Sequence, residues 1–457
     1  MDFVHRPYIP KETISAIATP PGEGGIAIVR ISGESAYEIA DKIFTGSVTS
    51  YISHTSHLGK IQDESGHIID EVLLLVMKGP KSFTGEDTVE IHCHGGALIT
   101  KKILELTLKA GARAALPGEF SFKAFMNGKI DLAQAEAIQE VVSAKNELAY
   151  NAAELHLQGA LSKKISQFQK KLLDVAAILN AWVDFPEEGL EFASLEELLE
   201  TLESILQEMT LLSQSFYEGK MIHEGLFLCL AGPPNAGKSS LMNALLGKDR
   251  AIVTEIAGTT RDLLEDNLQL GGLHFRLVDT AGIRDTEEKI EKEGIKRSRK
   301  AMDEADLILL VLDASTPLCK EALSLLELAP INKTLLLWNK ADLPLSFIKQ
   351  TPFPSISLSA LTGEGILLLK EMIQSQIWKK GPPSKEEVIL TNIRHKQALD
   401  SSISFLSAVI EGLKLNTSPE FLSFDIRKCL FELGTILGMN ISEEILSAIF
   451  SKFCVGK

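Results

Sequence analysis

The stretch LCLAGPPNAGKSSLMNALLG, residues 228–247, limits the possible folds of this chain more than any other feature. Within it, the run from Gly232 to Ser239 fits GxxxxGK[ST], with a strand-like apolar run before it and a helical run after it. In that context, loop N–H groups and the helix N-terminus hold phosphates, Lys238 reaches the outer phosphates and Ser239 binds Mg²⁺. The sequence therefore predicts a P-loop nucleotide-binding domain.

Three further motifs follow in the order expected of a GTP-binding domain. Asp279-Thr-Ala-Gly282 ends a strand-like run, where a carboxylate holds Mg²⁺ through water and the glycine amide senses a third phosphate. Asn339-Lys-Ala-Asp342 follows another apolar run, and an Asp there accepts hydrogen bonds from guanine N1–H and its amino group. Ser359-Ala360 is expected behind the base. Because adenine lacks that pair of donors, the motifs predict GTP rather than ATP.

The position that orients the attacking water in Ras-like proteins is not a glutamine in this chain. It is Ile283, whose side chain neither donates nor accepts a hydrogen bond. The acidic segment DTEEKIEKE, residues 285–293, offers carboxylates that could act as base or water anchor. The same residues also suit a solvated helix start, and the residues alone do not choose among them.

The positive charge for hydrolysis has more than one candidate source. Arg261 and Arg284 lie near the switch motifs, where an arginine also forms ordinary surface ion pairs. Asn235 inside the loop suggests another solution, because its side-chain oxygen and carbonyls of residues 254–260 suit a monovalent cation. Such a cation would stand where other GTPases place an arginine.

The pattern of apolar residues changes several times along the chain. Strand-like runs and one helix alternate over residues 13–110, helical periodicity dominates 121–219 and 388–450, and strands alternate with helices over 226–377. We predict a multidomain α+β and α/β protein in which a Ras-like GTPase domain is inserted into a split helical domain. The predicted domains are 1–120 (N-terminal α+β), 121–219 (helical, first part), 220–380 (GTPase) and 381–457 (helical, second part).

Composition narrows the class of protein further. The net charge of −15 argues against nucleic-acid binding over the whole surface, although it leaves room for a local basic patch. The five cysteines include no close pair, so they indicate neither a disulfide framework nor a zinc site. The chain has no run of eighteen apolar residues and no signal-peptide pattern at its start, which predicts a cytoplasmic protein without a membrane segment.

Seven blocks together carry a family likeness over nearly the whole chain. The chain resembles the tRNA modification GTPase family MnmE, also called TrmE, in the blocks TPPGEGGIAIVRISG, SFTGEDTVEIHCHGG, PGEFSFKAFMNGKIDLAQAEAI, GPPNAGKSSLMNAL, IVTEIAGTTRD, DTAGIRDT and FCVGK. The resemblance implies a homodimer with an N-terminal folate-binding and dimerisation domain. It also implies a heterotetramer with the FAD-dependent partner MnmG (GidA), which builds a carboxymethylaminomethyl-type group on C5 of the wobble uridine of certain tRNAs.

The resemblance assigns roles at the nucleotide. K⁺ would be held by Asn235, Thr254, Ile256 (through its carbonyl) and Thr259, and Mg²⁺ by Ser239 and Thr260. Glu291 would be the catalytic glutamate, acting with Lys238 and Thr260. The full set of positions expected to touch the nucleotide or its ions is Asn235, Ala236, Gly237, Lys238, Ser239, Ser240, Thr254, Glu255, Ile256, Ala257, Gly258, Thr259, Thr260, Asp279, Thr280, Ala281, Gly282, Asn339, Lys340, Ala341, Asp342, Ser359 and Ala360.

The resemblance also implies a site for 5-formyltetrahydrofolate, which supplies a one-carbon unit. Its residues would be Arg30, Glu90, Lys129 and the terminal Lys457. Cations suit the glutamate tail of folate and a carboxylate suits its amino-pyrimidine edge, yet each residue also has an ordinary surface role open to it. Cys454 is a nucleophile, a redox group or an apolar anchor.

Two questions stay open at this point. The basic cluster KEGIKRSRK, residues 292–300, suits tRNA phosphates and equally suits a solvated helix face. A GTP-gated ribosome-assembly or RNA-binding factor without folate chemistry would share the GTPase motifs. Only the N-terminal domain and the FCVGK tail distinguish it from the leading hypothesis.

Overall fold

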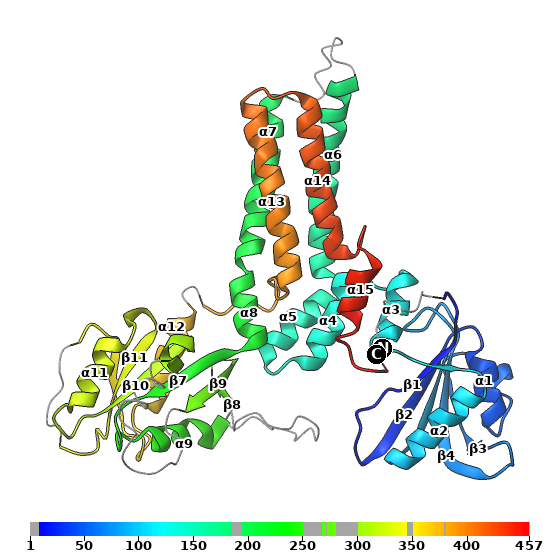
Figure 1. Cartoon of the computed structure of the whole chain (residues 1–457), viewed down its shortest axis with the longest axis horizontal. Coiled ribbons are helices and arrows are strands. Elements are labelled where there is room, and N and C mark those ends of the chain that lie inside the picture. The colour runs from blue at the N-terminus through cyan, green and yellow to red at the C-terminus, as the bar shows by residue number, and fades with distance from the viewer. Residues whose placement is uncertain are drawn as a thin grey trace. The chain divides into compact units, whose positions relative to one another are not determined.

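A computed structural model of the chain describes residues 9–184, 194–249, 267–270, 272–279, 300–344, 351–378 and 381–456. The chain divides into two compact units (Figure 1). The first comprises residues 1–142, 155–210 and 397–457, and the second comprises 143–154 and 211–396. The multidomain fold class is confirmed, whereas the domain boundaries at 120, 219 and 380 stay a prediction.

The first unit begins with a six-stranded sheet of order β3-β4-β5-β2-β1-β6. Its strands are β1 (Ile14–Ile17), β2 (Gly24–Ser32), β3 (Thr55–Gln62), β4 (Ile68–Met77), β5 (Thr88–Gly95) and β6 (Arg113–Ala114). Only β1 and β6 pair in parallel among the described strands of this sheet. Helices α1 (Ala36–Ile43) and α2 (Ala97–Lys109) cover one face, and a short 3₁₀ turn, η2 (Val48–Ser50), follows α1.

Alternation along the strands decides which face is buried. Ile31, Val72 and Ile91 point into the core under α1 and α2, while Arg30 and Glu90 lie on the opposite face. The runs predicted as strands over residues 13–19, 25–31, 71–77 and 88–93 are confirmed, as is the helix that became α2. Strands β3 and β6 and helix α1 were not among the predicted elements.

Nine further helices lie in the described sequence between the two sheets and after the second one. They are α3 (Glu119–Met126), α4 (Leu132–Ser143), α5 (Glu147–Leu157), α6 (Ala160–Asp184), α7 (Leu195–Gln214), α8 (Phe216–Glu224), α13 (Ile393–Lys414), α14 (Pro419–Leu437) and α15 (Glu443–Phe450). Helices α6 and α14 lie side by side although they are far apart in sequence (Figure 1). The helical character predicted for residues 121–219 and 388–450 is confirmed.

The second unit is built on a six-stranded sheet of order β12-β11-β10-β7-β9-β8. Its strands are β7 (Leu226–Ala231), β8 (Asn267–Leu270), β9 (Leu273–Asp279), β10 (Leu307–Asp313), β11 (Thr334–Asn339) and β12 (Ser355–Ser357). The helices packed on this sheet include α9 (Lys238–Asp249), α11 (Lys320–Leu328) and α12 (Ile366–Ile377), and a 3₁₀ turn, η3 (Ile331–Lys333), precedes β11. All strand pairs are parallel except the hairpin β8–β9.

Both faces of this sheet carry a buried apolar core. Leu228 and Leu309 face α9 and α12, whereas Cys229 and Leu310 face α11. Strands buried on both faces read as continuous apolar runs, such as LILLVLD in β10. The predicted, mostly parallel sheet with helices on both faces is confirmed.

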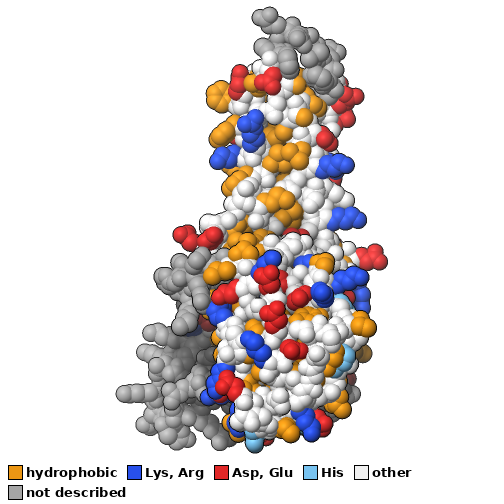
Figure 2. Space-filling model, turned by 90° about the vertical axis from the view of Figure 1, so that its right-hand side faces the viewer, with side chains coloured by type: hydrophobic (Ala, Val, Ile, Leu, Met, Phe, Trp, Pro, Cys, Tyr) orange, Lys and Arg blue, Asp and Glu red, His pale blue; other side chains and the backbone are white. Residues whose placement is uncertain are grey.

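Charged side chains of both signs are interspersed over the described part of the face shown in Figure 2, without a large field of one sign. Among the described residues, no helix combines the length and apolar character needed to cross a bilayer.

None of the five cysteines, all of them described residues, forms a disulfide. Cys93, Cys229 and Cys429 are buried, whereas Cys319 and Cys454 are exposed.

Candidate functional site

The phosphate loop connects the carboxyl end of β7 to the first residue of α9, Lys238. Gly237 has φ +93°, and a Cβ on it would lie 2.1 Å from Asn339 Nδ2. The sequence therefore needs glycine here both for the left-handed backbone and for the approach of the Asn339 amide. The N-terminus of α9 places the positive end of the helix dipole at this loop, which suits phosphate.

Three polar residues of the loop are described in the structure: Lys238, Ser239 and Asn235. Lys238 Nζ donates to the Gly232 and Pro233 carbonyls at 2.8 and 2.9 Å, so its ammonium lies across the loop. Ser239 is exposed at the start of α9, and Asn235 is exposed with φ 61°. Both residues are thus accessible from solvent at the loop.

A second group of side chains lies at the carboxyl ends of β11 and β12. Asn339 is buried; its Nδ2 donates to the Ala236 carbonyl at 2.8 Å and its Oδ1 accepts from the Ala360 N–H at 3.0 Å. Asn339 therefore ties the phosphate loop to the loop after β12. Ligands of parallel α/β sheets bind outside the carboxyl ends of the strands, which is where these residues gather.

Asp342 is exposed beyond this buried amide. Its Oδ1 accepts a hydrogen bond of 2.6 Å from Ser359 Oγ, and Ser359 itself is fully buried. Ser359 Oγ also accepts from the Thr362 N–H at 3.2 Å, which fixes the hydroxyl. The structure thus brings the three predicted motifs 232–240, 339–342 and 359–360 to one edge of the sheet.

Other predicted positions lie outside the described residues. They are Thr254, Glu255, Ile256, Ala257, Gly258, Thr259, Thr260, Arg261, Thr280, Ala281, Gly282, Ile283, Arg284, Glu291, Lys457 and, except for Lys300, the basic cluster 292–300. Asp279 is described as the last residue of β9, where the DxxG motif was expected to begin. The roles assigned to these residues stay predictions.

A separate cluster lies on the face of the N-terminal sheet opposite α1 and α2, where Arg30 and Glu90 are half-buried. Arg30 on β2 is paired with Glu90 on β5, with Arg30 Nε 2.7 Å from Glu90 Oε1. Arg30 Nη1 donates to the Gly456 carbonyl at 3.0 Å, across 426 positions of sequence. His92 Nε2 lies 3.3 Å from the other Glu90 oxygen. The structure therefore brings Arg30, Glu90 and the last residues of the chain together.

Close backbone contacts hold this C-terminal tail. The Gly118 N–H donates to the Cys454 carbonyl at 3.3 Å, and Phe453 is buried against Phe450. A Cβ on Gly456, which has φ +93°, would lie 2.5 Å from the Ile17 carbonyl oxygen, so only glycine fits against β1. Cys454 itself is exposed. A reactive thiol must be accessible, whereas an apolar anchor would be buried.

Lys129, the remaining predicted folate residue, lies elsewhere on the same domain. Its Nζ donates to the Pro80 carbonyl at 2.9 Å, and its stem lies beside Gly85. The 80–86 loop is held in turn by Lys123, which is buried and bonds Glu86 and the Glu12 carbonyl, each at 2.6 Å. Lys123 thus supports the loop on which Lys129 rests.

Comparison with known proteins agrees with this arrangement. The sequence matches the "GTP-binding protein TrmE N-terminus" family over residues 13–129 and the "MnmE helical domain" family over residues 132–454. The tRNA modification GTPase MnmE of Protochlamydia amoebophila (strain UWE25) is 60% identical over 459 residues, covering 100% of both chains. The protein of the same name from Chlamydia abortus (strain DSM 27085 / S26/3) is 46% identical over 449 residues, covering 98% of this chain and 100% of its own.

The chain belongs to the MnmE family of tRNA modification GTPases. As a member of the MnmE family it is a GTP hydrolase. Among solved structures, the G domain of the T. maritima FeoB iron transporter is 26% identical with a TM-score of 0.24, covering 34% of this chain and 97% of that one.

Two features of this chain were not predicted from its sequence. Gly456 and His92 join the Arg30–Glu90 pair, and Asp313 lies next to the guanine-type motif. A signal for Asp313 exists, because it is an acidic residue that ends an otherwise apolar strand. No local signal marks Gly456 as a partner of Arg30.

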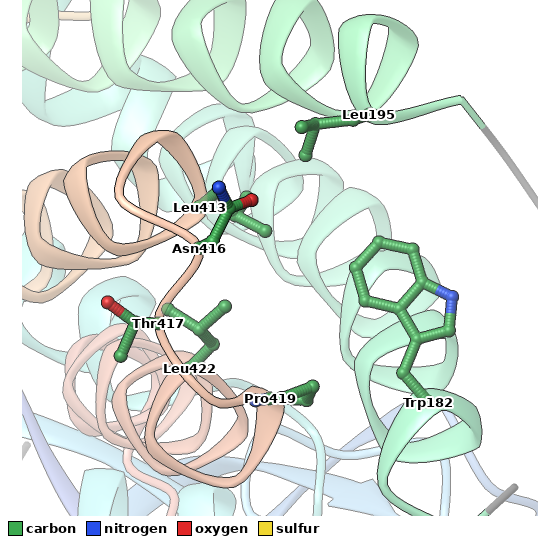
Figure 3. Close-up of a pocket in the computed structure, with 7 residues that line it drawn as sticks. All are labelled: Trp182, Leu195, Leu413, Asn416, Thr417, Pro419 and Leu422. Carbon is green, nitrogen blue, oxygen red and sulfur yellow. The ribbon is translucent and has the colours of Figure 1, made fainter. Parts of the chain in front are cut away.

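The helical part of the first unit also contains a mostly apolar pocket of about 300 Å³ (Figure 3). Its walls come from α6, α7, α13 and α14 and the turn between the last two. The lining residues are Trp182, Leu195, Leu413, Asn416, Thr417, Pro419 and Leu422. None of the residues predicted for nucleotide or folate binding lines it.

Proposed function

We propose that this chain couples GTP hydrolysis to modification of tRNA, acting in the cytoplasm as a homodimer with the FAD-dependent partner MnmG (GidA). The product would be a carboxymethylaminomethyl-type group on C5 of the wobble uridine of certain tRNAs. Support comes from the name shared by relatives that are 60% and 46% identical over nearly the whole chain. The observation that carries the folate part is the meeting of Arg30, Glu90 and Gly456.

At the nucleotide site, the residues present fit a guanine nucleotide with Mg²⁺. The N–H groups at the start of α9 and Lys238 would bind the phosphates. Ser239 and Thr260 would hold Mg²⁺, with Asp279 acting through water. Asp342 accepts hydrogen bonds from the guanine edge. Ser359 bonds its Oδ1, so Oδ2 is left to face the base. Asn339 and Ala360 fix the distance between base and phosphates.

Hydrolysis requires a group that orients water and a positive charge near the γ-phosphate. We assign the first role to Glu291 and the site of the second to Asn235, Thr254, Ile256 and Thr259, whose oxygens would hold K⁺. Bound K⁺ supplies the charge that an arginine supplies in other GTPases. The exposed Asn235 on the phosphate loop fits this assignment, since its amide oxygen is free to turn toward an ion.

Potassium dependence tests this assignment directly. GTP hydrolysis should be several times faster in KCl than in NaCl, and Asn235→Ala should remove the difference. Equal rates in both salts, with no effect of Asn235→Ala, would contradict the cation site while leaving GTP binding in place.

At the N-terminal site, the charged groups fit a reduced folate. Glu90 suits the amino-pyrimidine edge of the pterin, and Arg30, which is paired with Glu90, holds that carboxylate in place. Lys129 and Lys457 suit the carboxylates of the glutamate tail. Tetrahydrofolate bound there would supply the one-carbon unit. The cation–π contact of Arg30 with the buried Phe120 ring, at 5.6 Å, helps to orient the guanidinium.

The decisive experiment is mass spectrometry of wobble nucleosides from cells that lack this protein. The modified uridine should disappear and return when the gene is restored, but not when it carries Lys238→Ala. Retention of the modification would refute the tRNA assignment. Calorimetry with 5-formyltetrahydrofolate on the full chain separates this proposal from a GTP-gated assembly factor, which would not bind folate.

A further inference from the structure

Asp313 lies beside the Asn339–Asp342 motif. It is not among the residues expected to contact the nucleotide. Strands β10 and β11 run in parallel with Asp313 opposite Asn339, so both strands end at the same level. Asp313 Oδ2 lies 2.6 Å from Lys340 Nζ. The carboxylate therefore holds the ammonium of the second residue of the motif.

The Asp313 carboxylate is itself fixed from its other side. Its Oδ1 accepts from the Ser315 N–H at 2.9 Å and from the Ser315 hydroxyl at 2.6 Å. Burial would raise the pKa of Asp313, but the bonds from Lys340 and Ser315 outweigh it and lower the pKa below its ordinary value. Asp313 thus stays charged and keeps one orientation, as an anchor for a cation requires.

The backbone of Lys340 explains why an anchor is useful. Lys340 has φ 65°, a left-handed conformation that costs a non-glycine residue roughly 1–2 kcal/mol. This corner lets the Ala341 N–H bond the Leu358 carbonyl at 3.1 Å and directs the chain toward Asp342. Asn339 and Asp342 are held by the loop after β12, while Lys340 is held by β10.

We propose that Asp313, supported by Ser315, is a positioning residue of the guanine site, holding Lys340 so that its methylene stem forms a wall against the face of the base. The inference rests on the guanine site proposed above, because it uses the same motif. A lysine stem is flexible and its ammonium is strongly hydrated, so without a fixed partner the stem would not keep one place. Asp313 acts through Lys340 and not through the residues assigned to the phosphates or the attacking water, so it should affect binding and not the chemical step.

The test compares Asp313→Asn with the unchanged full chain. GDP affinity measured by calorimetry should weaken about fivefold and KM for GTP should rise by a similar factor, while kcat stays within about twofold. Ser315→Ala should produce a smaller change in the same direction. Glu147→Gln is the matched control, because it makes the same chemical change in an exposed ion pair of the same unit, with Lys385, and should leave affinity unchanged.

A double-mutant cycle separates positioning from a general structural role. Lys340→Met keeps an apolar stem but removes the ammonium, so adding Asp313→Asn should weaken GDP binding by less than about twofold more. Full additivity of the two changes, a matching fall in kcat, or unchanged affinity in Asp313→Asn would each overturn the proposal.

A third variant distinguishes failure of the inference from failure of the guanine site. Asp342→Asn should weaken GDP binding and favour xanthosine diphosphate, whose edge suits an amide. If that exchange fails, the proposed base site is wrong; if it succeeds while Asp313→Asn has no effect, only the positioning role is wrong.

Discussion

The nucleotide site and the N-terminal site are built in different ways. The nucleotide site uses the backbone of short motifs that follow strand ends, and a few buried side chains such as Asn339 hold the loops together. The N-terminal site uses charged side chains from distant segments, as when Arg30 bonds both Glu90 and the Gly456 carbonyl. The first site should therefore be sensitive to backbone geometry and the second to charge.

The largest effect is expected where a methyl group would enter the nucleotide site. Gly237→Ala forces a left-handed alanine and places its Cβ 2.1 Å from Asn339 Nδ2, so it also displaces the bond to Ala236. Together these cost about 3 kcal/mol, or roughly a hundredfold in nucleotide affinity. Calorimetry with GDP measures it.

Gly381→Ala is the control for that substitution. Gly381 has φ +87° but nothing within 4 Å of its added Cβ, so it imposes the backbone cost without the collision. If both variants bound GDP equally, approach of the Asn339 amide would not be what requires glycine in the loop.

The next effect concerns the buried ion pair behind the N-terminal site. Lys123→Met leaves Glu86 without its partner in a region where the lysine is 1% exposed, and should lower the free energy of unfolding by about 3 kcal/mol. Lys171→Met breaks an exposed pair with Glu208 and should cost less than about 0.5 kcal/mol. Urea denaturation measures the loss of stability, and hydrogen exchange of the β4 and β5 amides shows where it occurs. Equal costs would mean that burial does not set the strength of the pair.

The N-terminal site and the nucleotide site should bind their ligands independently. Arg30→Ala should weaken binding of 5-formyltetrahydrofolate at least about tenfold, because it removes a charge-assisted contact. GTP hydrolysis without tRNA should change by less than about twofold. Lys11→Ala, which breaks an exposed pair with Glu34 in the same domain, should alter neither measurement. A large fall in basal GTP hydrolysis in Arg30→Ala would show that the N-terminal site also supports the nucleotide site.

The smallest effect concerns His274 in the second unit, which is buried without a charged partner in the described part of the chain, unlike Lys123 in the first unit. His274 on β9 is 4% exposed, and its two ring nitrogens have no hydrogen-bond partner within the described residues. Burial, followed by the positive charges of Lys145 and Arg276, lowers its pKa from 6.5 to about 4. Since protonation is then easier in the unfolded chain, stability is full above pH 6.5 and falls between pH 6.5 and about 4.

At pH 5.5 the expected loss is about 1 kcal/mol, read from hydrogen exchange of the β9 amides. His274→Leu should remove this part of the pH dependence and leave that of the N-terminal strands unchanged. An identical pH profile in His274→Leu would assign the loss to other groups.

The same contrast explains what could be predicted from the sequence. The order of strands and helices around the phosphate loop followed from apolar runs such as LILLVLD, since a doubly covered parallel sheet imposes that pattern. Strand β3 was missed because it lies at the sheet edge and alternates exposed with half-buried residues, leaving few apolar positions to mark it. The Arg30–Gly456 bond joins segments 426 positions apart, and no local pattern encodes such a pairing.

The contact of Gly456 with Ile17 and Ala18 has a consequence for how the protein is made. The first strand leaves the ribosome long before Gly456 does, so the N-terminal site is completed only when residues near Gly456 have been synthesised and have docked. A product shortened by a few residues would carry an intact GTPase sequence and an incomplete N-terminal site.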